Sequence, residues 1–192
     1  METYNLAALT KKLYQSPLAL FTIKTLRDLS GADLPQATFF SLLSRLTKQH
    51  ILQKLERDKY MLAGGRVHDF SIANFLYEPS YVSLETALNF HGILAQFPYE
   101  IASITPKKPT TKILNGKTFR YVRIKQTLFW GYEPAHGFLI AQPEKALLDL
   151  LYLQSKGLAI AHTDEMDLSK LDKPRLAAYA NRFPPLKGMD FR

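Results

Sequence analysis

One continuous stretch, residues 21–62, constrains the fold of this 192-residue chain more than any other. Thr22 is placed to cap a helix, and Gly31 is placed to end it. Pro35 suits the first turn of the next helix, which we expect to end at His50, after a turn over residues 32–34. The residues that follow alternate in the manner of a short, charged hairpin. Helix, turn, helix and hairpin in this order predict a winged helix-turn-helix, preceded by a first amphipathic helix over residues 5–14.

The helix expected over residues 35–50 has two chemically distinct sides at 100° per residue. Its apolar side gathers Phe39, Leu42, Leu43, Leu46 and His50. The opposite side carries small, hydroxyl and cationic groups, namely Ala37, Thr38, Ser41, Ser44, Arg45 and Lys48. Small groups allow close approach to base edges, hydroxyls bond bases or phosphates, and arginine binds guanine through two hydrogen bonds. This side therefore predicts DNA contact, and the plainer alternative is a solvated helix face.

The hairpin expected over residues 51–62 places Glu56-Arg57-Asp58-Lys59 at its turn. Its cations Lys54, Arg57 and Lys59 are candidates for contact with the phosphate backbone beside the groove. The alternative is a hairpin that only covers the core of the winged helix-turn-helix, with its charges in solvent.

The net charge of +8 and the pI of about 9.6 favour an acidic partner such as nucleic acid. The excess is +5 over residues 1–66 and +3 over residues 67–130, whereas residues 131–192 are neutral. The basic excess therefore belongs to the expected DNA head and to the segment that follows it.

Several classes of protein are disfavoured by what the chain lacks. It has no cysteine, and no apolar run long enough for a bilayer span or a signal peptide, so we expect a soluble cytoplasmic protein. No HExxH, GxSxG or GxxxxGK[ST] motif occurs, so we expect neither an enzyme nor a cofactor or metal site. The acidic residues around His162, including Glu165, are more typical of a solvated loop than of a metal site.

The residues after Ala63-Gly64-Gly65 are predicted to form a second domain, because a short segment of small residues and glycines is typical of a linker between domains. We place the DNA-binding domain at residues 1–66 and a mixed body at 67–192. The body is expected to hold helices over 81–92, 142–157 and 172–181, a strand over 99–105, and a hairpin turning at Asn115-Gly116. The predicted fold class is α+β.

Seven cations and no acid lie between residues 107 and 125: Lys107, Lys108, Lys112, Lys117, Arg120, Arg123 and Lys125. We call this segment the basic strip. It predicts a second phosphate-binding surface, above all through Lys107, Lys108 and Lys112. The equally weighted alternative is an edge hairpin that its cations keep soluble.

Three blocks of the body resemble the AbiEi-type antitoxin family of type IV, abortive-infection toxin–antitoxin systems. They are YEPSYVSLETALNFHGIL, the run ITPKKPTTK…GKTFRYVRIKQTLFWGYE, and GFLIAQPEKALLDLLYL, in the order of the family and over about residues 74–155. The resemblance implies a bacterial or archaeal autorepressor that binds double-stranded operator DNA through the winged head, at Thr38, Ser41, Arg45 and Lys48. It also implies antagonism of a partner toxin, a nucleotidyltransferase-like AbiEii protein.

Two other functions remain open at this point. One is a solitary winged-helix transcriptional regulator whose C-terminal domain senses a ligand or dimerises. The other is an enzyme or a toxin-side protein with a DNA-targeting head, for which the sequence offers no catalytic constellation.

Overall fold

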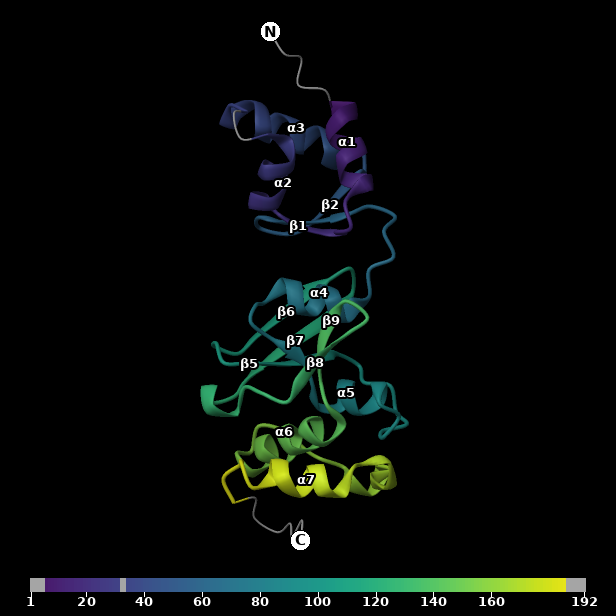
Figure 1. Ribbon diagram of the computed structural model, residues 1–192, viewed down its shortest axis with the longest axis vertical. Helices are drawn as coiled ribbons and strands as arrows, with labels where there is room; N and C mark the ends of the chain where they lie inside the picture. The colour runs from purple at the N-terminus through teal and green to yellow at the C-terminus, as the bar shows by residue number, and fades with distance from the viewer. Residues whose placement is uncertain (1–5, 32–33, 186–192) are drawn as a thin grey trace. The chain divides into compact units, whose positions relative to one another are not determined.

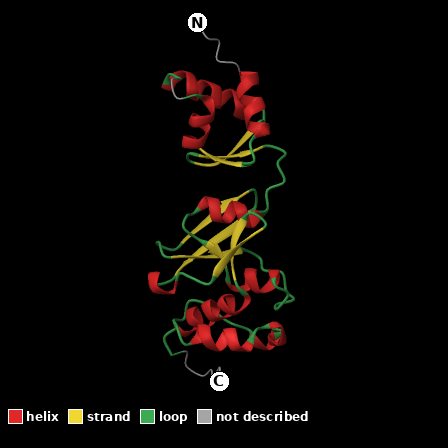
Figure 2. Cartoon of the chain, viewed as in Figure 1, coloured by secondary structure: helices red, strands yellow, loops and turns green. Residues whose placement is uncertain are grey.

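The computed structural model describes residues 6–31 and 34–185, and shows an α+β protein (Figures 1 and 2). The predicted fold class is therefore confirmed. The chain forms two compact units, residues 1–67 and 68–192, whereas the boundary expected from the sequence was between residues 66 and 67. The turn expected at Ala32-Asp33 lies outside the described residues, as does residue 5 of the first helix.

The N-terminal unit combines three helices with a three-stranded antiparallel sheet (Figure 1). In chain order these are α1 (Leu6–Gln15), β1 (Leu20–Thr22), α2 (Ile23–Ser30), α3 (Gln36–Lys48), β2 (Leu52–Glu56) and β3 (Lys59–Leu62). The strand β3 lies in the middle of the sheet, between β1 and β2. The sequence did not reveal β1, because a three-residue strand is too short to show a period of two.

The core of this unit collects the inward residues of all three helices and of the sheet. Its members are Leu9, Leu13, Phe21, Leu26, Leu34, Phe39, Leu42, Leu43, Leu46, Leu52 and Tyr60. Four apolar residues of α3 recur at helical spacing and reach this core, namely Phe39, Leu42, Leu43 and Leu46.

Two expectations for α3 were wrong in detail. His50 is exposed and has a φ of 54°, because α3 ends at Lys48 and the chain turns sharply before β2. Pro35 is the N-cap, one position before the first helical residue. The expected caps of α2 are confirmed, since the Thr22 hydroxyl accepts from the Thr25 amide at 3.1 Å and Gly31 ends the helix with a φ of 103°.

The body, residues 68–192, is built on a mixed six-stranded sheet with the order β6-β7-β5-β4-β9-β8. Its strands are β4 (Tyr81–Val82), β5 (Ile101–Thr105), β6 (Thr110–Leu114), β7 (Lys117–Arg123), β8 (Tyr132–Ala135) and β9 (Phe138–Ala141). Its α-helices are α4 (Asp69–Leu76), α5 (Leu84–Phe90), α6 (Pro143–Ser155) and α7 (Lys173–Ala180). The 3₁₀ turns are η1 (Gln126–Leu128), η2 (Thr163–Glu165) and η3 (Leu168–Lys170).

The helices of the body cover both faces of this sheet (Figures 1 and 2). The helix α4 packs on β4, β5 and β9, while α5 and α6 pack together on the other side, with α7 outside α6. The helix α6 is buried along its length from Glu144 to Leu153, as expected for a helix between a sheet and another helix.

Several expected elements of the body are confirmed. The hairpin turns at Asn115 and Gly116, whose φ angles of 51° and 76° are those of a two-residue type I′ turn. The helices expected over 142–157 and 172–181 are α6 and α7. The helix expected over 81–92 is shorter, because Tyr81 and Val82 form a strand that pairs with β5 and β9.

Ser83 precedes α5 as expected, but its hydroxyl does not cap the helix. It donates instead to the carboxylate of Asp149 at 2.9 Å. Among the described residues, no helix is both long and apolar enough to cross a membrane.

Candidate nucleic-acid interface

The outer face of α3 is open to solvent. Ser41, Ser44, Arg45 and Lys48 are exposed, and Thr38 is half-buried. The opposite residues, from Phe39 to Leu46, fill the core and fix the rotation of the helix about its axis. The structure therefore brings all five predicted DNA-contacting residues of α3 to one accessible side.

Arg27 connects α2 to the start of α3, a role that sequence reasoning missed. Its guanidinium donates to the Leu34 carbonyl at 3.1 Å and lies 5.3 Å from the centre of the Phe39 ring. These two contacts hold the end of the turn and the first turn of α3 together. The signal in the sequence was weak, since a lone arginine on an amphipathic helix is usually solvated.

A shallow hollow of about 280 Å³ lies between α3 and the hairpin. Its polar wall includes Ser44 and Lys48 from α3 and Lys54 from β2. Two cations from different elements, Lys48 and Lys54, thus line the same hollow, which suits a phosphate group. Tyr60 also lines this hollow, and burial, with a smaller effect from Asp58, raises the pKa of its hydroxyl.

Phe40 lies on the same outer side of α3, and 45% of it is exposed. It packs edge-on against Phe39, with ring centres 5.4 Å apart, and lines the groove. Two consecutive phenylalanines on an amphipathic helix cannot both face the core, so the exposure of one ring could have been predicted from the sequence. An exposed aromatic ring beside hydroxyls and cations is able to contact a thymine methyl group.

The hairpin cations differ in their surroundings. The Arg57 side chain is 93% exposed at the turn, and its guanidinium lies 3.7 Å from the Asp58 carboxylate. The Lys59 ammonium lies 2.7 Å from the Glu56 carboxylate, which reduces its free charge. Asp58 fixes the turn, because its carbonyl accepts from the Ile23 amide at 2.8 Å at the start of α2.

In the body, part of the basic strip is engaged with the end of α4. The Lys112 ammonium donates to the Leu76 carbonyl at 2.8 Å, and Lys107 donates to the Glu78 carbonyl. Both ammonium groups lie over the Tyr77 ring, at 5.5 and 5.7 Å from its centre. Cations at a helix C-terminus satisfy carbonyls that have no partner within the helix. These two lysines therefore have a structural role besides any contact with phosphate.

Other cations of the basic strip are paired with acids that lie elsewhere in the sequence. Lys117 lies 2.5 Å from Asp69, and Arg120 pairs with Glu100. Lys108, Arg123 and Lys125 are exposed. Because these acids lie outside residues 107–125, the sequence of the strip alone overestimates its unpaired positive charge.

A fully buried ion pair in the body was also missed. Lys145 and Asp149 lie one turn apart on α6, and both side chains are 0% exposed. The Tyr81 hydroxyl bridges them, since it accepts from Lys145 at 2.8 Å and donates to Asp149 at 3.0 Å. Burial lowers the pKa of Lys145 and raises the pKa of Asp149. A lysine four residues before an aspartate was the only signal, and it is common on solvated helices.

The Lys145 ammonium is enclosed by aromatic rings. It lies 5.3, 5.1 and 5.2 Å from the ring centres of Tyr81, Trp130 and Phe183. Gly131 leaves space for the Lys145 side chain, because a Cβ at this position would lie 2.9 Å from it. The pair is sealed from solvent, which suits a role in folding better than one in binding. In the described ranges 6–31 and 34–185, no three His, Asp or Glu residues lie together so as to hold a metal ion.

No protein-family model matches this chain, and no curated protein matches it either. Among solved structures, the fold is similar to the crystal structure of the RV2827C protein from Mycobacterium tuberculosis. The match has a TM-score of 0.61 at 15% sequence identity, and covers 93% of this chain and 71% of that one. At this identity the likeness shows a shared fold alone.

Proposed function

We propose that this chain binds double-stranded DNA through α3 and represses transcription, with its N-terminal unit acting as a winged helix-turn-helix. The observation that carries the proposal is the outer face of α3, where Ser41, Ser44, Arg45 and Lys48 are exposed on a helix held by a packed core. The order of three helices followed by the β2–β3 hairpin supports it.

The chemistry of this face suggests a division of roles. Arg45 is suited to bind guanine, with Thr38 and Ser41 approaching neighbouring bases or phosphates. Lys48 and Lys54, which line one groove, are suited to a phosphate, and Arg57 to the backbone beside it. The exposed cations account for affinity, and Arg45 for sequence preference.

The antitoxin role rests on the resemblance of the body to AbiEi-type proteins. On that basis we propose that the chain represses its own operon and antagonises a nucleotidyltransferase-like toxin encoded beside it. Co-expression with the product of the adjacent gene tests this part. Rescue of growth by the full chain supports it, and continued growth arrest argues against it.

A second candidate is a solitary regulator whose body senses a ligand or dimerises. A hollow of about 480 Å³ in the body favours ligand sensing. A gene neighbourhood without a nucleotidyltransferase would favour this candidate over the antitoxin.

The DNA-binding proposal is tested by selecting duplexes from a random pool with the full chain. We expect a defined sequence motif, and an affinity for it that falls steeply as salt rises, because cations release counterions from the phosphates. Recovery of unselected sequences, or no retention of DNA at low salt, would refute the proposal.

A further inference from the structure

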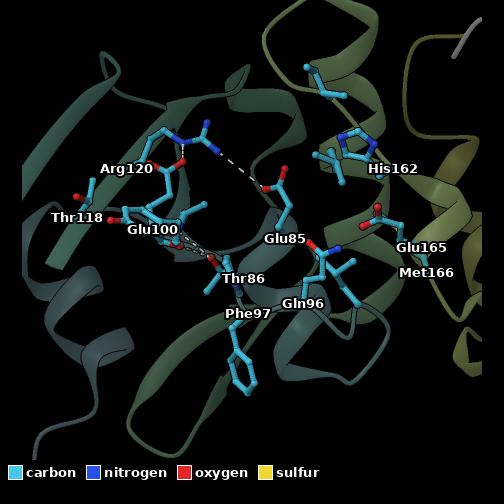
Figure 3. Close-up of a pocket in the computed structure, with 16 residues that line it drawn as sticks. Glu85, Thr86, Gln96, Phe97, Glu100, Thr118, Arg120, His162, Glu165 and Met166 are labelled. Carbon is cyan, nitrogen blue, oxygen red and sulfur yellow. Dashed lines mark hydrogen bonds and ion pairs between the residues drawn. The ribbon is translucent and has the colours of Figure 1, made fainter.

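The hollow of about 480 Å³ in the body differs in charge from the rest of this basic protein (Figure 3). It is lined by Glu85 of α5, Glu100 just before β5, Arg120 of β7 and Glu165 of η2. Figure 3 shows Arg120 and Glu100 on one side and Glu165 on the other, with Glu85 between them. Three carboxylates, one guanidinium and the imidazole of His162 therefore share one space, so the carboxylates outnumber the guanidinium.

The arginine of this hollow is already engaged. Arg120 pairs with Glu100, and its other nitrogen lies 4.0 Å from the Glu85 carboxylate. Glu165 forms no ion pair with any residue in the part of the chain that the structure describes. The hollow therefore keeps a negative balance in a protein whose net charge is +8, and an anionic ligand would be repelled.

Hydrogen bonds hold both walls of the hollow in place. The Thr86 hydroxyl donates to the Glu100 carbonyl at 3.1 Å and accepts from the Ala102 amide at 2.9 Å. On the other wall, a β-bridge joins Leu94 to Met166, next to Glu165. A hollow framed in this way exists before any ligand arrives, as in most small-molecule sites.

Apolar groups complete the lining. Leu94 and Ala102 are buried in the wall, and Ile160, also in the lining, is 70% exposed. The lining also includes Phe97 and Tyr99, which are 90% and 102% exposed. Large apolar side chains held in water beside a hollow are typical of binding surfaces.

We propose that this hollow binds an organic cation, an ammonium or guanidinium group carried on an apolar body. The cation lies between Glu165 and Glu85, and the apolar part lies against Ile160 and the exposed aromatic side chains. The same chemistry is offered by a free amine and by an arginine side chain of a peptide. The proposal rests on the body alone, so it stands whether or not α3 binds DNA.

The test is a calorimetric and NMR titration of the full chain with two cationic probes. One is phenethylamine, and the other is the capped peptide acetyl-Leu-Arg-Leu-amide. Their uncharged matches are 2-phenylethanol and the same peptide with citrulline in place of arginine. The variants are Glu165→Gln and Glu85→Gln, with Asp164→Asn as the matched control, because Asp164 is exposed and does not line the hollow.

We expect at least one cation to bind, with amide shifts around residues 85 and 165, and its uncharged match to bind about fivefold to tenfold more weakly. Glu165→Gln weakens the cation by a similar factor, whereas Asp164→Asn leaves its affinity unchanged. Binding of the amine alone identifies a small molecule as the source, and binding of the peptide alone identifies a protein segment. Equal binding of charged and uncharged probes, or no binding of either cation at about 10 mM, overturns the proposal.

Discussion

At the scale of single residues, the body contains a fully buried ion pair between Lys145 and Asp149. A buried charge is costly unless a partner compensates it, and here Tyr81 and Ser83 complete the set of hydrogen bonds. The sequence shows only a lysine and an aspartate four residues apart. The aromatic rings that enclose the lysine, those of Tyr81, Trp130 and Phe183, come from other segments of the chain, so no local pattern predicted the burial of the pair.

Lys145→Met is expected to lower the free energy of unfolding by about 3–5 kcal/mol, because it leaves the Asp149 carboxylate buried without a cation. The double variant Lys145→Met/Asp149→Leu is expected to recover most of that loss. Urea denaturation of the full chain, followed by a probe in the body such as Trp130, measures both. A double variant as unstable as the single one would show that the charges are not coupled.

At the scale of elements, contacts between α2 and the start of α3 connect the two helices of the candidate DNA-binding motif. The amphipathic pattern predicted both helices, and Thr22 and Gly31 predicted the ends of α2, because those signals are local. It did not predict the contact of Arg27 with Leu34 and Phe39, because that contact depends on how two helices pack. It also assigned His50 to the core, although the chain leaves the helix two residues earlier.

Arg27→Ala is expected to destabilise the N-terminal unit by about 1–2 kcal/mol, because it removes a hydrogen bond and a cation–π interaction. DNA affinity is expected to fall while the preferred sequence stays the same, because no base-contacting group is removed. Thermal denaturation and anisotropy titration measure the two effects. Lys24→Ala, an exposed residue on the same helix, is the control. A changed base preference in Arg27→Ala would contradict this positioning role.

The basic strip is the second element that carries a prediction. If it binds phosphates, Lys107→Gln/Lys108→Gln/Lys112→Gln lowers the slope of log affinity against log salt by up to about 0.9 for each phosphate that is no longer neutralised. The preferred sequence stays the same. Because Lys107 and Lys112 also hold the end of α4, we expect a lower melting temperature as well. Lys156→Gln, exposed elsewhere on the body, shows the effect of losing one positive charge outside the strip. An unchanged slope would restrict DNA binding to the N-terminal unit.

At the scale of the whole molecule, local signals were sufficient for the fold class and for most helices, whereas long-range pairing was not predicted. The Asn115-Gly116 turn identified one hairpin, because its backbone demands those residues. The strands β4, β8 and β9 are short and join a mixed sheet with both parallel and antiparallel neighbours, so their sequences carry little periodicity. The candidate DNA-contacting residues of α3 were predictable because one helix carries them all. The acidic hollow was not, since its walls come from segments that are separate in the chain.

We propose that Arg45 contacts a base from the exposed face of α3, and this contact can be tested directly. The most direct measurement compares Arg45→Ala with Lys11→Ala, an equal loss of charge on the exposed side of α1, by anisotropy titration against the selected duplex and its single-base variants. We predict that Arg45→Ala costs about 1–3 kcal/mol of binding and loses preference at one base pair, while Lys11→Ala keeps both affinity and preference. Wild-type affinity and unchanged base preference in Arg45→Ala would contradict the account.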